Sequence, residues 1–125
     1  MLTIRKEQMG VFETLFQERF RENLRLHLRG ELAEETKGIT DAELGRLIQV
    51  GIERARGYEI TTERDITLFV DLMFLKGRDF DRDPTLPWVR TTLINKQLDG
   101  EAKMQAIFRR LAAFENRKAM PDEIQ

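Results

Sequence analysis

The sequence contains no cysteine and no serine, and its only histidine is His27. Without cysteine the chain has no disulfide, no thiolate metal site and no cysteine nucleophile. Without serine it has no serine-based nucleophile elbow, and one histidine is too few for a His-rich zinc site. The eight glycines are scattered, so no phosphate-binding glycine loop is present. These absences predict a protein that is not an enzyme and that uses no metal or cofactor.

Neither sign of charge is in large excess, because the 125 residues carry a formal net charge of -1. This balance disfavours a strongly basic nucleic-acid binder and a polybasic membrane binder. The richest apolar stretch, residues 66–75, is interrupted by Thr67 and Asp71. A membrane span needs about 20 apolar residues, and a secretory leader needs about 7–15 behind a basic start. We therefore expect a soluble, cytoplasmic domain that does not contact a membrane.

What the sequence does contain is a set of helix signals. Apolar residues recur every three or four positions, and Thr40 with Glu43 has the spacing of a capping box. These signals predict an all-α fold, a bundle of four to five helices in one domain of residues 1–119, followed by a flexible tail at 120–125. The expected helices cover residues 3–30 (capped by Thr3), 41–57, 63–75, 87–96 and 101–117, and the segment 36–38 is the alternative end of the first.

Two of these helices are expected to pack closely. Residues 66–75 are apolar nearly all round, which is typical of a helix in the middle of a bundle. Gly51 lies on the apolar face of the preceding helix, where its missing side chain would allow close contact. Gly57 is expected to end that helix. The apolar face of the first helix is formed by Met9, Phe12, Phe16, Phe20, Leu24 and Leu28.

The most unusual stretch is residues 77–84, in the loop between the third and fourth expected helices. Aspartate occupies alternate positions there, at Asp79, Asp81 and Asp83. This spacing opens an EF-hand calcium loop, but the sixth position is Pro84 instead of glycine and the twelfth is Arg90 instead of glutamate. We therefore expect no calcium site. The aspartates are expected to cap turns and to pair with the arginines nearby, Arg78, Arg82 or Arg90.

Asp71 stands in the middle of the apolar segment 66–75. A buried carboxylate needs a partner or takes up a proton. The structural interpretation pairs Asp71 with an arginine of a neighbouring helix, Arg54 or Arg56, and an exposed position is the alternative. The functional interpretation is a catalytic acid, but no second catalytic group has a defined place beside it. His27 has no neighbouring ligand pattern and is expected to be an ordinary surface or boundary residue.

Two surfaces are candidates for binding a partner. One is a basic stripe on the first helix, made by Arg21, Arg25 and Arg29. It would suit phosphates or an acidic protein, although Glu18 and Glu22 beside it favour a solvated face with local ion pairs. The preferred surface is the loop 78–88, because loops on rigid scaffolds often carry binding function. Its predicted contact residues are Arg78, Phe80, Asp81 and Trp88, and an inward anchoring role for Phe80 and Trp88 is the alternative.

Several short segments between residues 4 and 95 carry a family resemblance. They are IRKEQM at 4–9, GIERA at 51–55, YEITTERD at 58–65, FVDLMF at 69–74, Gly77, DFD at 79–81 and LPW at 86–88. This combination resembles small bacterial proteins encoded near type VI secretion spike and toxin genes. The resemblance implies a role in toxin delivery, as an adaptor, a chaperone or an immunity protein.

We therefore expect a non-catalytic interaction module that serves as an adaptor or chaperone for a secreted toxin or spike component. An immunity protein to a toxin is one alternative. A helical nucleic-acid-binding regulator that uses the arginine stripe is another, although the net charge makes nucleic acid the less favoured ligand. A small enzyme built around Asp71 or the loop aspartates is the third.

Overall fold

The computed structural model describes residues 6–119, and every element of regular structure in that range is helical. The elements are α1 (Lys6–Glu31), α2 (Ala33–Thr36), α3 (Asp41–Gly57), α4 (Glu63–Leu75), the 3-10 turn η1 (Phe80–Arg82), α5 (Pro87–Leu93) and α6 (Gly100–Ala119). The predicted all-α fold is confirmed. The expected cap at Thr3 and the expected tail at 120–125 lie outside the described residues, as do the side chains of Met9 and Phe12.

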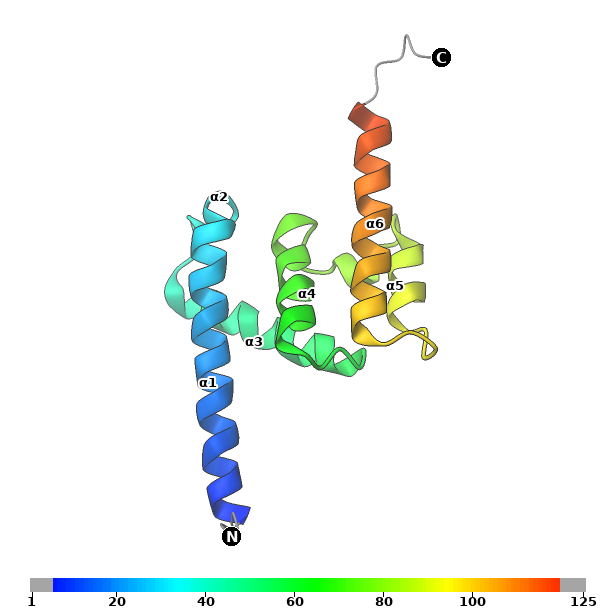
Figure 1. Cartoon of the computed structure of the whole chain (residues 1–125). Helices are drawn as coiled ribbons and strands as arrows, with labels where there is room; N and C mark the ends of the chain where they lie inside the picture. Colours follow the sequence, from blue (N-terminus) through cyan, green and yellow to red (C-terminus); the bar gives the residue numbers. More distant parts are fainter. Residues whose placement is uncertain (1–5, 120–125) are drawn as a thin grey trace.

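Helix α4 lies in the middle of the molecule, between α1 on one side and the α5–α6 pair on the other (Figure 1). Helix α3 runs from α1 to α4 and contacts both, and α6 packs against α4 and α5. The apolar residues of α4 that this arrangement buries are Ile66, Phe69, Val70, Leu72 and Met73. Burial on several sides explains why this segment is apolar nearly all round, and it confirms the predicted central helix.

Helix α1 meets the core only along its second half. Phe20, Leu24 and Leu28 are buried there, as their helical spacing predicts. Phe16, one turn earlier on the same face, is 62% exposed. The first half of α1 extends beyond the other helices (Figure 1), so the apolar face continues past the point where the body of the protein ends.

Gly51 is the point of closest approach between α3 and α4. A Cβ atom at this position would lie 2.8 Å from Val70 Cγ2 and 2.9 Å from Met73 Sδ, closer than side chains pack. The absence of a side chain therefore lets α3 approach α4, which confirms the predicted reason for a glycine on this face. By contrast, a Cβ atom at Gly45, two turns earlier in the same helix, would meet nothing within 4 Å.

The beginnings of α3 and α4 are capped as their sequences predict. The Thr40 hydroxyl accepts the backbone N–H of Glu43, and the Thr62 hydroxyl accepts that of Asp65, each over 3.2 Å. Such caps satisfy N–H groups that have no partner inside the helix. Local sequence signals thus set where both of the central helices begin.

Helix α3 ends at Gly57, as predicted, but the left-handed residue that turns the chain comes two positions later. Glu59 adopts a left-handed conformation with φ of 64°, a position at which helices commonly end. The carbonyl of Tyr58 then accepts a hydrogen bond from the buried Lys103 ammonium over 2.7 Å. A cation at this end is favoured by the helix dipole, so Lys103 of α6 holds the end of α3.

Three other features were not predicted. The single-turn elements α2 and η1 are too short to show a helical period. Helix α5 stops at Leu93, short of the expected end at residue 96, because the Asn95 side chain accepts the backbone N–H of Gln97 over 2.9 Å and turns the chain. Local hydrogen bonds of this kind decide where short elements end. The spacing of apolar residues does not reveal them, so these ends could not be predicted from it.

Candidate binding surface

Phe80 fixes the loop between α4 and α5 to the core. Its side chain is 2% exposed, and its ring centroid lies 5.0 Å from that of Phe69 on α4. The ring of Tyr58, which caps the end of α3, lies 6.0 Å from the same Phe69 ring. Tilted aromatic contacts of this kind stabilise beyond the burial of area. Phe80 is therefore an inward anchor, and its predicted role as a partner contact is wrong.

Asp81 is the second anchor of the loop, and its side chain is completely buried. The Tyr58 hydroxyl donates a hydrogen bond to Asp81 Oδ2 over 2.7 Å, and Arg54 Nη1 donates to Asp81 Oδ1 over 3.2 Å. Burial and the Asp81 carboxylate raise the pKa of Tyr58, so the hydroxyl keeps the proton that it donates. Asp81 therefore ties the loop to α3, and the prediction that it contacts a partner is also wrong.

The other two loop aspartates also have partners within the chain. Asp79, 74% exposed, lies 3.2 Å from Arg54 Nη1. Asp83 accepts hydrogen bonds from the backbone N–H and the hydroxyl of Thr85, which lower the pKa of its carboxyl. The part of the chain that the structure describes has no group of three acidic or histidine side chains arranged to hold a metal ion. Arg54 of α3, rather than an arginine of the loop, is the main cationic partner of Asp79 and Asp81, whereas Asp83 caps a turn as predicted.

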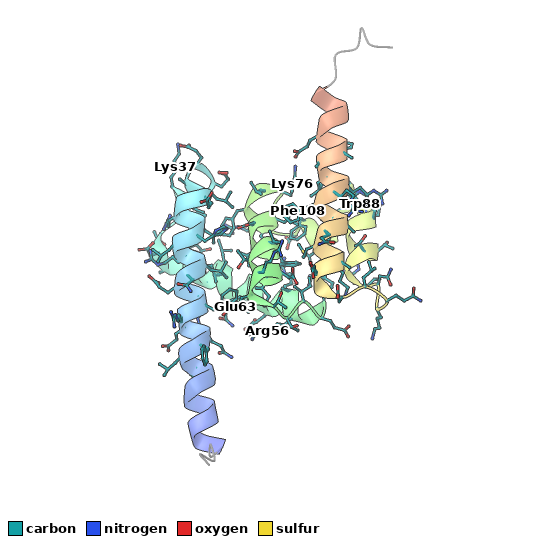
Figure 2. All side chains as sticks on the ribbon, in the orientation of Figure 1. Lys37, Arg56, Glu63, Lys76, Trp88 and Phe108 are labelled. Carbon is teal, nitrogen blue, oxygen red and sulfur yellow. The ribbon has the colours of Figure 1, made fainter. Side chains whose placement is uncertain are left out.

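The outer side of the loop continues into a groove between α5 and α6. Its volume is about 320 Å³, and it is lined by Thr85, Leu86, Trp88, Arg110, Leu111, Ala113 and Phe114. The Arg110 guanidinium lies 4.6 Å from the centroid of the Trp88 ring, within the range of a cation–π contact. Figure 2 shows Trp88 where α5 meets α6. Of the four predicted loop contacts, the partly buried Trp88 and the exposed Arg78 remain accessible.

The predicted basic stripe is largely used within the fold. Arg21 donates to the Gln49 side chain of α3 over 2.9 Å, and Arg29 donates to Asp41 over 2.7 Å. Arg25 lies 3.7 Å from the same Asp41, and the two arginines lower the pKa of that carboxyl. Arg21 and Arg29 therefore fasten α1 to α3. Arg25 Nη2 also lies 2.6 Å from Glu22 Oε1, which confirms the local ion pair expected from the sequence. A role on phosphates would have to break these contacts.

Asp71 pairs with His27, not with Arg54 or Arg56. His27 Nε2 lies 2.9 Å from Asp71 Oδ1 and 3.1 Å from Oδ2, so the pair links α1 to α4. Burial raises the pKa of Asp71, and the hydrogen bond and charge of His27 act in the opposite direction. Asp71 is thus paired and partly buried, but the predicted arginine partner is wrong, because Arg54 is held by Asp81 of the loop and Arg56 is exposed.

This pair predicts a pH-dependent stability. The pKa of Asp71 is higher in the folded state than in the unfolded state. Protonated Asp71 therefore adds to the free energy of unfolding below its unfolded-state pKa, and this contribution is lost as the pH rises through the folded-state pKa. In a His27→Ala background, Asp71→Asn should therefore raise the free energy of unfolding at neutral pH, and the gain should vanish at about pH 3, below the ordinary aspartate pKa. Urea unfolding at both pH values measures this. An equal gain at both would contradict it.

Sequence reasoning missed three residues of this surface: Arg54 and Tyr58, which hold the loop, and Arg110, which covers Trp88. One signal was present for the first two. Residues four apart lie on one helix face, so Arg54 and Tyr58 are placed together at the end of α3. No signal in the sequence joins Arg110 to Trp88, because they lie on different helices.

Comparison of the chain with protein-family models, with curated proteins and with solved structures finds no match. Within residues 6–119, no helix has both the length and the apolar character needed to cross a membrane. The features of the molecule that bear on its function are therefore the surface of the loop and the groove beside it.

Proposed function

We propose that this protein is a non-catalytic adaptor or chaperone that binds a secreted toxin or spike component of a type VI secretion system in the cytoplasm. The proposed contact surface consists of Arg78 and the α5–α6 groove around Trp88. The resemblance of residues 4–95 to proteins encoded near spike and toxin genes supports this class of partner. An adaptor role also accounts for the tryptophan and arginine side chains at the α5–α6 groove, since these residue types contribute strongly to protein interfaces.

The observation that carries the proposal is the Trp88–Arg110 pair, which joins α5 to α6 beside the anchored loop. Tryptophan and arginine dominate the energetics of protein interfaces, especially beside a pocket that excludes water. Here they lie 4.6 Å apart beside a groove of about 320 Å³. Phe80 and Asp81 hold the loop that leads into α5, so little conformational entropy remains to be lost on binding.

An enzyme built around Asp71 has less support. Its carboxylate is engaged by His27, and the chain has neither serine nor cysteine to act as a nucleophile beside this pair. The loop aspartates are likewise engaged by Arg54, Tyr58 and Thr85. Binding through the groove uses side chains that the fold leaves accessible.

The test is co-expression of the whole protein with each spike and toxin component of the source bacterium, followed by size-exclusion chromatography and calorimetry. We expect one component to co-elute, and Trp88→Ala to weaken its binding by about 30-fold, the effect of losing an interface hot spot. Leu26→Ala, which truncates an exposed apolar side chain on α1, is the matched control and should leave binding unchanged. A folded Trp88→Ala variant that binds like the wild type would contradict the proposal.

A further inference from the structure

A second hollow lies at the end of α3, beside the loop and α5. It is an open cleft of about 440 Å³, lined by Arg54, Gly57, Tyr58, Arg82 and Arg90. Arg90 and Trp88 are two positions apart on α5, which places them roughly 200° apart around the helix. The cleft is therefore separate from the α5–α6 groove.

Three guanidinium groups and no carboxylate line this cleft. The nearest buried anion, Asp81, is already engaged by Tyr58 and Arg54. Arg82 lies 3.8 Å from Asp81 and is 62% exposed, which makes a weak ion pair. Arg90 is exposed, and its guanidinium forms no hydrogen bond or ion pair with another residue of the described chain. Both arginines thus keep N–H donors for an outside acceptor.

Both arginines line the same cleft as Tyr58, Arg82 from η1 and Arg90 from α5. Their guanidinium groups can therefore contact one small anion together. The hydrogen bond of Arg82 and the charge of Arg90 each act to lower the pKa of Tyr58, against the larger effects of burial and of Asp81. A planar guanidinium binds a carboxylate through two parallel hydrogen bonds, so two of them form a strong site for this group.

We propose that this cleft binds a carboxylate of the partner protein, on an acidic side chain or at a chain end. The inference rests on the proposed function, since it specifies the chemistry of the same partner. A protein carboxylate is favoured over nucleic acid because the exposed Asp79 lies 3.2 Å from Arg54 Nη1 of the cleft lining. This carboxylate would repel a continuous phosphate backbone, and the chain as a whole carries a net charge of -1.

The test titrates the whole protein at low salt with a blocked peptide that carries a single glutamate and follows the backbone amide signals by NMR. We expect saturable shifts at Gly57 and Tyr58. Arg82→Gln and Arg90→Gln should each weaken the peptide about fivefold, the effect of one exposed charge-assisted contact. Arg109→Gln removes an exposed arginine outside the cleft lining and is the matched control. It should change the affinity by less than about twofold.

Absence of saturable shifts would overturn the inference, as would equal affinity in the Arg82→Gln, Arg90→Gln and Arg109→Gln variants. Parallel titrations with an oligothymidine strand and with inorganic phosphate identify the source of the anion. Tighter binding of the oligonucleotide at the cleft, or shifts with inorganic phosphate alone, would also overturn it. Preference for the peptide supports it.

Failure of this inference is distinguishable from failure of the proposed function. A toxin or spike component that binds the Arg82→Gln and Arg90→Gln variants as tightly as the wild type, but is lost in Trp88→Ala, overturns the carboxylate site alone. Peptide binding that depends on Arg82 and Arg90, without any toxin or spike partner, overturns the proposed function and supports the site.

Discussion

Phe69→Asp should leave the chain unfolded at room temperature. Phe69 is completely buried on the central helix α4, and its ring contacts those of Tyr58 and Phe80. Removing a buried phenylalanine side chain costs about 3–5 kcal/mol, and a buried carboxylate without a partner adds several more. Together these approach or exceed the roughly 5–15 kcal/mol by which a domain is stable. Far-ultraviolet circular dichroism and thermal melting measure the result.

A conservative change at the same position supplies the control. Phe69→Leu keeps an apolar side chain of somewhat smaller volume and should retain the helical spectrum with a lower melting temperature. Native-like stability of Phe69→Asp would show that α4 is not central to the core. It would also contradict the contacts that this ring makes with the end of α3 and with the loop.

The starts and the buried faces of α3 and α4 could be predicted from the sequence, because local signals agree with the packing. Thr40 and Thr62 each stand before an apolar period of 3.6 residues, and Gly51 lies where that period faces α4. Each of these features acts within one or two turns of its own position. A reading of neighbouring residues therefore places the helix starts and identifies the buried faces.

The side-chain partners across the fold did not follow, because they depend on how the helices cross. His27 and Asp71 are separated by 44 residues, and Tyr58 and Asp81 by 23. A face can be assigned to each helix without knowing which polar residue on the next helix stands opposite. The same limit applies to Phe80, for which the inward and outward orientations were equally compatible with the sequence. The partner class stays a prediction, since it depends on the family resemblance alone.

The loop of the proposed binding surface depends on one buried carboxylate, and Asp81→Ala should destabilise the protein by about 3–5 kcal/mol. Removing one member of a buried ion pair leaves the other charge uncompensated. Asp81→Ala removes the carboxylate that contacts Arg54, whose side chain is only 21% exposed, and that accepts the hydrogen bond of the Tyr58 hydroxyl. Urea unfolding gives the free energy, and the backbone amide signals of residues 78–88 report whether the loop keeps its conformation.

Asp79→Ala is the matched control, because Asp79 also lies 3.2 Å from Arg54 Nη1 but is largely exposed. An exposed pair of this kind contributes about 1 kcal/mol or less, so this variant should remain close to the wild type. Tyr58→Phe should fall between the two, since it removes one hydrogen bond and leaves the Arg54 contact. Equal effects of Asp81→Ala and Asp79→Ala would mean that burial does not set the strength of this anchor. The loop would then be held by Phe80 alone, and its rigidity would no longer support the binding surface.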